Sequence, residues 1–578
     1  MKNKYISIIA SVALAIGATS CVDLDTAPTD QKSTATMWQT PEDAEQGVSI
    51  LYGYVPNAME QNDEDVYTDN AVHGIKWAVG NRGHGVWSAA DYSWSGEYTY
   101  IRYANLVFAN IDRVEGLSES QRNNILGQAY FFRAWIYFDL IKQFGGVPYI
   151  TEPLELAEQA GIVREEWKTC YDNVMADFDK AIQMLPETSA SGRVNKYVAR
   201  AYKMRAALYY ANPACQFSAS DGWTVAAAEA KAIMDSGKYD LFDGDYAGTA
   251  KDYTGKYPEM FWDFNIDKSK EGILVSYQNS SLGTGAWFIG FEAFPTNGWG
   301  GTNPTQDYVD CFEDCEGAPL SKSTIYDPLH PDQNRDPRLK TNVLFSGETM
   351  YGTLVDTRPL NSAGERGLFE MTSESCGDAT LTGYHAKKWL NPEVDPQQDG
   401  WDYDAAACAM RYTEVLLSYA EAKNETNALD PTAFAAVNKV RARVGMPALQ
   451  NSDPSKPTYC ATQDDLRQRI RNEWRVEFGF EGDHRQWDAR RWNIATDVLN
   501  ADRYSYKFTL RKDPANALPG DDGWVCDLYV GDPIKITNQI IRYEPHNYLF
   551  PIPQAQIDLS KDPATGEYRL KQNPGYTY

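Results

Sequence analysis

The stretch from Asp464 to Ala495 holds the densest set of charged side chains that could do chemistry. If it begins as one helix, it carries two stripes of like charge at a spacing of four residues. These stripes are Arg467, Arg471 and Arg475, and roughly opposite them Glu473, Glu477 and Glu481. Like charges at this spacing destabilise an isolated helix by about 0.2–0.5 kcal/mol per pair, so the side chains need partners elsewhere.

Four more charged residues follow in the same stretch: Arg485, Asp488, Arg490 and Arg491. Together with the two stripes, they could form an anion site or an acid/base pair. They could also form an ion-pair network between helices. We favour the network, because this many matched charges more often neutralise each other than await a ligand.

The sequence lacks the short motifs of several enzyme classes. It contains no H-E-x-x-H, no G-x-x-x-x-G-K-[ST] and no G-x-S-x-G, and its six histidines are scattered. A glycoside hydrolase needs only two carboxylates at a suitable distance, which 80 acidic residues leave open. Acidic loops such as 399–404 lack the D-x-D-x-D-G pattern of a calcium site, so we expect no bound metal.

Composition excludes some classes of partner. The 578 residues carry a net charge of −26, which disfavours nucleic acid. Hydrophobic residues make up 43% of the chain, enough for a large core. Aromatic residues make up 13%, more than such a core requires, so some rings are expected to face outward. The nine cysteines are too sparse for a disulfide scaffold, and Cys311 and Cys315 form either a local disulfide or two unpaired thiols.

The N-terminus has the layout of a secretory signal. Lys2 and Lys4 precede an apolar run from Ile6 to Ala18, which is too short to span a bilayer. Small residues then lead to Cys21, as in the cleavage site of bacterial lipoproteins. We predict a signal peptide at 1–20 and a lipidated Cys21. The alternative is a soluble secreted protein with an incidental cysteine.

Apolar residues at helical spacing recur along much of the chain. They predict helices at 127–140, 167–185, 193–210, 225–236, 411–425 and 432–444. Pairs joined by short connections suggest tetratricopeptide-like stacking. Between about 249 and 404 the pattern gives way to Gly, Pro, Asn and Asp, with short apolar pieces such as Ile273–Tyr277 that favour small strands. A long irregular insertion of this kind is usually functional.

The segment IRNEWRVEFGFEGDHRQWDARRW, Ile470 to Trp492, resembles the signature of the SusD/RagB family of Bacteroidota outer-membrane lipoproteins. Other segments agree in order, among them GQAYFFRAWIYFDLIKQFGGVPYI, RDPRL, VNKVRARVGMP and the tail YLFPIPQAQI through QNPGY. One position departs from the pattern, because Trp474 stands where the signature often has Arg.

The resemblance implies a mainly α fold: a tetratricopeptide-like helical scaffold with long irregular loops and a few short strands. We expect one domain over 21–578, with the scaffold at about 40–248 and 405–500, a loop-rich insertion at about 249–404 and a tail at 501–578. It also implies a cell-surface lipoprotein, anchored in the outer membrane, that captures a glycan and delivers it to a SusC-like TonB-dependent transporter. No cofactor and no catalysis are expected. The alternatives are a binder of peptide or glycoprotein nutrients with the same transporter and, less favoured, a glycoside hydrolase.

Glycan binding requires aromatic platforms for the C–H face of a sugar and planar polar groups for its hydroxyls. Two loop regions supply both, one before Tyr100 and one around 287–303. The candidate binding residues are Trp77, Asn81, Arg82, Trp87, Asp91, Trp94, Trp287, Phe288, Phe294, Asn297, Trp299 and Asn303. The alternative is that most of these rings pack loops onto the scaffold, because large rings are usually well buried.

Overall fold

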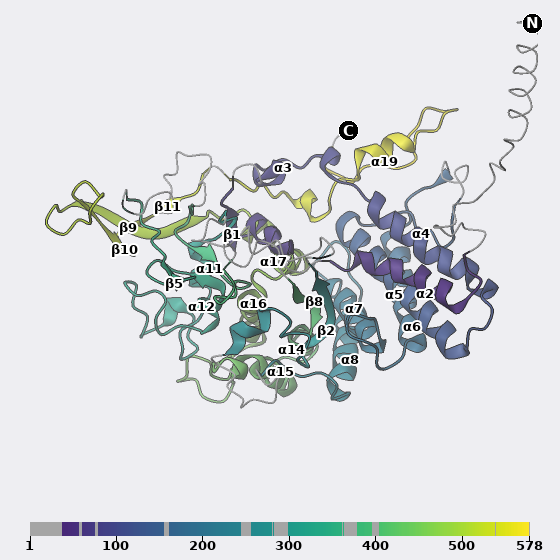
Figure 1. Cartoon of the computed structure of the whole chain (residues 1–578), viewed down its shortest axis with the longest axis horizontal. Coiled ribbons are helices and arrows are strands. Elements are labelled where there is room, and N and C mark those ends of the chain that lie inside the picture. Colours follow the sequence, from purple (N-terminus) through teal and green to yellow (C-terminus); the bar gives the residue numbers. More distant parts are fainter. Residues whose placement is uncertain are drawn as a thin grey trace, which may run out of the picture.

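A computed structural model describes residues 37–56, 60–75, 79–154, 161–243, 256–279, 281, 299–360, 362, 379–395, 404–537 and 539–576. It contains a stack of helices drawn from two parts of the chain, which extends from the middle of the molecule to one side (Figure 1). The first part supplies α4 Ser95–Asn110, α5 Glu119–Phe144, α6 Trp167–Met184, α7 Lys196–Tyr209 and α8 Gly222–Asp235. The second supplies α14 Tyr412–Thr426, α15 Pro431–Arg443 and α16 Gln463–Phe478. Helices α4 to α8 pack in sequence order, α14 packs on both α15 and α16, and α8 packs on α14, so the two parts form one stack.

Helix α5 illustrates how the sequence determines where these helices begin, end and are buried. Ser118 caps its start, with the Gln121 side chain reaching back to the Ser118 backbone, and Gly145 ends it at a φ of 74°. Most of its sides are apolar and buried, as predicted for 127–140. The helix begins eight residues earlier than predicted, at Glu119, because its first two turns are largely polar and show no hydrophobic stripe.

The charged stretch after 462 forms two helices. Thr462 and Asp465 make a reciprocal cap at the start of α16, which ends at Gly479. Phe480 and Gly482 then adopt positive φ values of 62° and 66°, and α17 follows at His484–Arg491. Gly479 is required for close packing, because a Cβ there would lie 2.0 Å from the Tyr308 hydroxyl.

Short strands tie distant segments to the stack. Strand β2, Gly272–Gln278, pairs antiparallel with β8, Ala405–Arg411, which confirms the strand expected at 273–277 and joins the two ends of the insertion. Strand β1, Ala71–His73, pairs antiparallel with β3, Thr302–Pro304. The tail forms a three-stranded sheet in the order β10-β9-β11, from Trp524–Leu528, Tyr504–Lys512 and Asp532–Lys535, which the sequence did not reveal.

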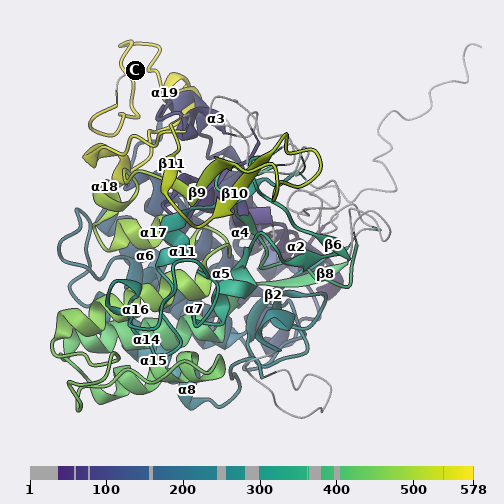
Figure 2. The ribbon, with the colours of Figure 1, turned by 90° about the vertical axis from the view of Figure 1, so that its left-hand side faces the viewer.

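The remaining elements are short. The helices are α2 Pro41–Ser49, α3 Gly80–Gly83, α11 Gln306–Asp310, α12 Arg338–Asn342, α18 Ala495–Val498 and α19 Gln554–Leu559. The strand pairs are β4 Val343–Leu344 with β7 His385–Ala386, and β5 Thr349–Met350 with β6 Thr353–Leu354. Helices α3 and α19 lie along the same edge of the molecule in both views (Figures 1 and 2). The fold is mainly α with long loops and a few short strands, as predicted.

A buried ion-pair network surrounds α16 and confirms the favoured interpretation of Glu473, Glu477 and Glu481. Its cations are Arg338, Lys388, Arg411, Arg441, Arg443 and Arg469, and its carboxylates are Glu271, Glu313, Asp336, Glu473, Glu477 and Glu481. Glu477 lies at the centre. Burial raises the pKa of its carboxyl, but the surrounding arginines outweigh burial and hold it well below the ordinary value.

The arginine stripe of α16 has other partners. Arg467 pairs with Glu425 on α14, and Arg475 pairs with Asp307 at 2.7 Å. The guanidinium of Arg471 lies 5.0 Å from the ring of Trp492. Cys311 and Cys315 are free thiols, which decides between the two states expected for them.

Candidate functional site

The two aromatic loop regions of the sequence meet at the β1–β3 pair. Val72 is opposite Asn303, and the Gly74 amide donates to the Gly301 carbonyl at 2.8 Å. Only glycine fits at position 74, because a Cβ there would lie 2.0 Å from the Gly300 carbonyl oxygen. The ends of the two regions therefore lie side by side. Five candidate residues are outside the described residues: Trp77, Trp287, Phe288, Phe294 and Asn297.

Two candidate residues are structural, contrary to the sequence-based expectation. Trp94 is only 3% exposed, and its ring meets the edges of Tyr98 and Phe144 in the core of the stack. Asn303 is fully buried, where its amide donates to the Gly300 carbonyl and accepts from the Leu381 amide, each at 3.0 Å. Neither side chain can reach a ligand, so both leave the candidate site.

Asn81, Arg82 and Asp91 shape the loop that carries Trp87. The Asn81 amide donates to the Asp91 carboxylate at 3.0 Å, which links α3 to the turn at 89–91 on the surface. Arg82 is largely buried under the loop. Its guanidinium pairs with Glu64 at 3.0 Å, donates to Gln486 and lies 4.2 Å from the ring of Tyr67. Arg82 therefore connects this loop to α17 rather than facing solvent.

Among the predicted platforms that the structure describes, Trp87 and Trp299 keep part of their surface exposed. Trp299 is 37% exposed beside β3. Trp87 is half-buried, with its indole N–H donating to the Arg542 carbonyl at 2.9 Å. Its ring makes a T-shaped contact with that of Tyr543, with the ring centroids 5.7 Å apart, and its centroid lies 5.9 Å from that of Phe550. These contacts fix the orientation of the Trp87 ring.

Trp87 borders an open surface hollow of about 610 Å³ between its loop and the C-terminal segment. The loop contributes Gly85 and 87–90, and the C-terminal segment contributes Arg542, Glu544, His546, Asn547, Gln554, Gly575 and Tyr576. The Ile540 amide donates to the Gly83 carbonyl at 3.0 Å, and a Cβ on Gly85 would lie 2.8 Å from Arg542 Cγ. Loop and segment are therefore in direct contact beside the hollow.

Sequence reasoning missed the C-terminal half of this hollow. The Tyr576 hydroxyl donates to the Leu549 carbonyl at 2.7 Å, and its ring meets the edge of His546 at 4.7 Å. The tail residues had no motif that marked them as ligands, although YLFPIPQAQI and QNPGY carried part of the family resemblance. A ring beside amide, carboxylate and guanidinium groups can stack on an apolar face and hydrogen-bond to hydroxyls.

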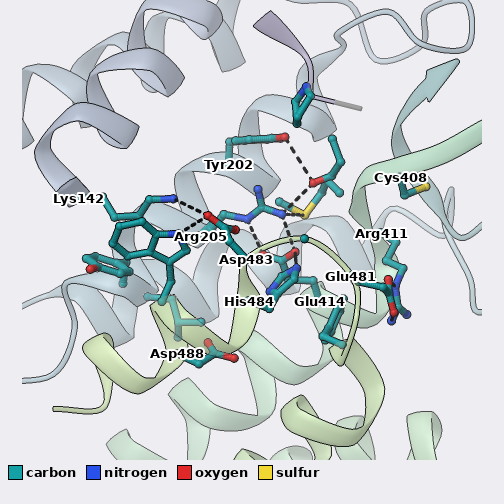
Figure 3. A pocket seen from close by; sticks show the side chains of 18 of the residues that line it. Lys142, Tyr202, Arg205, Cys408, Arg411, Glu414, Glu481, Asp483, His484 and Asp488 are labelled. Carbon is teal, nitrogen blue, oxygen red and sulfur yellow. Dashed lines mark hydrogen bonds and ion pairs between the residues drawn. The ribbon is translucent and has the colours of Figure 1, made fainter. Parts of the chain in front are cut away.

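A second space lies inside the helical stack, between α5, α7, α14 and the turn from α16 to α17 (Figure 3). This central cavity has a volume of about 150 Å³. Arg205 lies between two groups of side chains, Lys142 with Asp483 on one side and Glu414 with His484 on the other (Figure 3). Arg205 binds Glu414 through two nitrogens at 2.6 and 2.7 Å, and Lys142 pairs with Asp139 at 3.1 Å.

Charges in the central cavity compensate one another. Burial raises the pKa of Glu414, but Arg205 outweighs it and holds the carboxyl below its ordinary value. Burial lowers the pKa of His484, whose Nε2 lies 3.9 Å from Glu414. Trp474 packs on Phe478 at 5.2 Å and lies under the Arg491 guanidinium at 5.1 Å, so its ring takes a cation–π contact. We assign this cavity to the scaffold.

In the described part of the chain, no cluster of three or more His, Cys, Asp or Glu side chains is placed to hold a metal ion. None of the helices described there combines the length and apolarity needed to cross a membrane.

Comparisons with known proteins identify the same kind of protein along both parts of the chain. A family described as the SusD family matches residues 258–576, and one described as starch-binding and associating with the outer membrane matches residues 24–209. The SusD-like protein P25 of Formosa agariphila is 23% identical over 537 residues, covering 87% of this chain and 93% of that protein.

Solved structures show the same fold. A SusD-like protein from Bacteroides fragilis superposes with a TM-score of 0.74 at 26% identity, covering 95% of this chain and 100% of the other. A laminarin-binding SusD-like protein superposes with a TM-score of 0.61 at 20% identity, covering 93% and 100%. Because the SusD family match spans more than half of the sequence, the chain belongs to the SusD family.

Proposed function

We propose that this protein captures an oligosaccharide or polysaccharide at the cell surface and delivers it to a SusC-like TonB-dependent transporter in the outer membrane. The observation that carries the proposal is the oriented ring of Trp87 beside a hollow lined with polar groups. The matching family described as starch-binding and the structural neighbour described as laminarin-binding support a glycan as the ligand. Lipidation of Cys21, which precedes the described residues, would hold the protein at the membrane.

In this proposal, Trp87 stacks on the C–H face of a sugar ring. Arg542, Glu544 and Gln554 are placed around the hollow to meet its hydroxyls. One stacked ring contributes on the order of 1 kcal/mol, so a single platform cannot hold an oligosaccharide. We therefore include Trp299 and the candidate residues outside the described part of the chain, Trp77, Trp287, Phe288, Phe294 and Asn297, as further contacts of a longer ligand.

The first test is a glycan array with the purified protein, followed by titration calorimetry of the best ligand. Trp87→Ala should lower the affinity about tenfold, the loss of one stacking contact and its orientation. Trp524→Ala is a matched control. Trp524 is 42% exposed, and it lies on the β9–β10 hairpin, which projects away from α3 and α19 (Figure 1). This variant should bind as the wild type does.

Other outcomes would point to other functions. Release of new reducing ends during incubation with the bound glycan would mean catalysis and would contradict a binding role. Binding to peptides or glycoproteins with no retention of any free glycan would replace the ligand class. An unchanged glycan affinity in Trp87→Ala would remove the hollow from the site. Co-purification with a TonB-dependent barrel from native membranes would test the transporter partnership.

A further inference from the structure

A second surface hollow, of about 580 Å³, lies between α16 and the segment 310–326 of the insertion. We call it the α16 hollow. It shares no lining residue with the hollow beside Trp87. Helices α11 and α16, which border it, lie away from the edge that carries α3 and α19 in both views (Figures 1 and 2). The two hollows are therefore separate places on the surface.

Tyr326 contributes a supported aromatic ring to the α16 hollow. The support comes from Arg335, the first residue of RDPRL, which is buried and donates to three backbone carbonyls at 2.7–2.9 Å. The guanidinium carbon of Arg335 lies 5.2 Å from the centre of the Tyr326 ring, so it covers one face of that ring. The Tyr326 amide also donates to the Ser323 hydroxyl at 3.1 Å. A half-buried ring held in this way can stack on the C–H face of a sugar.

Polar groups with free hydrogen-bonding capacity accompany this ring. Gln468 and Asn472 lie four residues apart on the same side of α16, and both line the hollow. Asn472 uses its Nδ2 for the Cys311 carbonyl at 3.0 Å. In the described part of the chain, neither the exposed Gln468 amide nor the hydroxyls of Ser321 and Tyr326 are hydrogen-bonded to protein groups. Amides and hydroxyls both donate and accept, which suits them to the hydroxyl rim of a sugar.

The charged side chains of the α16 hollow favour a neutral ligand. Its one arginine, Arg469, is buried and paired with Glu313, which also pairs with Arg441 at 2.8 Å. Asp310 accepts from the Gln306 amide at 2.8 Å and forms no ion pair among the described residues. The lining therefore offers no uncompensated positive charge, and a uronic or sulfated sugar would be repelled by Asp310.

We propose that the α16 hollow is a second glycan-binding site, which takes neutral sugar units of the polymer captured beside Trp87. This inference rests on the proposed glycan-binding function. The α16 hollow is similar in volume to the hollow beside Trp87, at about 580 and 610 Å³, and it combines the same kinds of group, a ring held in place and polar side chains around it. Two sites on one chain keep a polysaccharide bound when one of them releases it, which raises the overall affinity without any new contact.

Hydroxyl-radical footprinting with mass spectrometry tests both hollows in the wild-type protein. The probes are the neutral hexasaccharides maltohexaose, laminarihexaose, mannohexaose and xylohexaose, and the acidic hexagalacturonate. Oxidation of Trp87 reports on the first hollow and oxidation of Tyr326 on the second, and the exposed Trp524 corrects for radicals that the sugar consumes. We expect at least one neutral hexasaccharide to protect Tyr326 saturably, by about twofold or more, because a stacked sugar covers a face of the ring.

Variants locate the effect. Gln468→Ala changes an exposed position and should raise the sugar concentration needed to protect Tyr326 about threefold, while protection of Trp87 stays the same. Gln183→Ala is the matched control, because Gln183 is exposed on α6 and lines neither hollow. Tyr326→Ala should lower the affinity for the polymer of the protecting sugar about tenfold, and Tyr326→Phe, which keeps the ring, should retain most of it. If Tyr326→Ala does not fold, Gln468→Ala still decides.

The outcomes separate this inference from the proposed function. Protection of Trp87 without protection of Tyr326 would overturn the second site and leave glycan capture beside Trp87 intact. Protection of Tyr326 by hexagalacturonate alone, or at an unchanged sugar concentration in Gln468→Ala, would also overturn it. Protection of Tyr326 alone would support the α16 hollow and remove the hollow beside Trp87 from glycan binding. If no probe protects either ring, both proposals are contradicted.

Discussion

Buried charges in this protein occur in two kinds of surroundings. Around α16, Glu477 is contacted by Arg338, Arg411 and Arg443, and the network holds as many cations as carboxylates. Asp65 and Arg490, by contrast, are buried with only neutral hydrogen-bond partners among the described residues. In the network around α16 each charge is matched by one of opposite sign within the protein, and these ion pairs hold segments of the chain together. An unmatched carboxylate such as Asp65 can instead gain or lose a proton as the pH changes.

The largest loss of stability is expected from removing the central carboxylate of the ion-pair network around α16. Glu477→Gln removes the carboxylate shared by three arginines and leaves their charges uncompensated in the interior. The free energy of unfolding should fall by about 3–5 kcal/mol. Urea denaturation followed by circular dichroism measures it. A loss below about 1 kcal/mol would mean that the network contributes little to holding these segments together.

A somewhat smaller effect is expected at Asp65, an unmatched carboxylate. It accepts from the Phe480 amide at 2.6 Å and from Asn70 at 3.2 Å, and burial raises its pKa from 3.8 to about 7. Because the native state holds this proton more tightly than the unfolded state does, the contribution of Asp65 to stability is complete below about pH 4. It is lost as the pH rises through about 7.

Comparison with Asp65→Asn isolates this contribution, because asparagine stays neutral. The stability of the variant relative to the wild type should increase between about pH 4 and pH 7, by roughly 2–4 kcal/mol. Urea denaturation at several pH values measures the difference. A difference that stays constant across this range would show that Asp65 is ionised in the native protein throughout.

The smallest effect is expected from a matched pair at the surface. Lys168 and Asp172 on α6 lie 2.6 Å apart, closer than Arg411 and Glu477 at 2.9 Å, but Lys168 is 60% exposed. Lys168→Ala should change the free energy of unfolding by at most about 0.5 kcal/mol, because water screens the pair. Measured beside Glu477→Gln, it separates the effect of burial from that of distance. A loss as large as that of Glu477→Gln would remove burial as the explanation.

The sequence predicted the scaffold better than the site. Helical spacing located α5 to α8, α14 and α15, because each buries a continuous stripe of its own residues. It could not show that Trp94 is buried while Trp87, seven residues earlier, lines a hollow. That difference depends on Phe144 and on the C-terminal segment, which are distant in sequence. For the same reason, Arg542, Glu544 and Tyr576 gave no local signal of their role.

The contact between α8 and α14 also bears on how the protein is made. About 175 residues separate Asp235, at the end of α8, from Tyr412, at the start of α14. At a synthesis rate of about 5–20 residues per second, roughly 10–35 s pass before the partner of α8 has been translated. During that interval the side of α8 that meets α14 is uncovered. The stack therefore cannot be completed from its N-terminal end as the chain emerges, and closes only when most of the protein has been made.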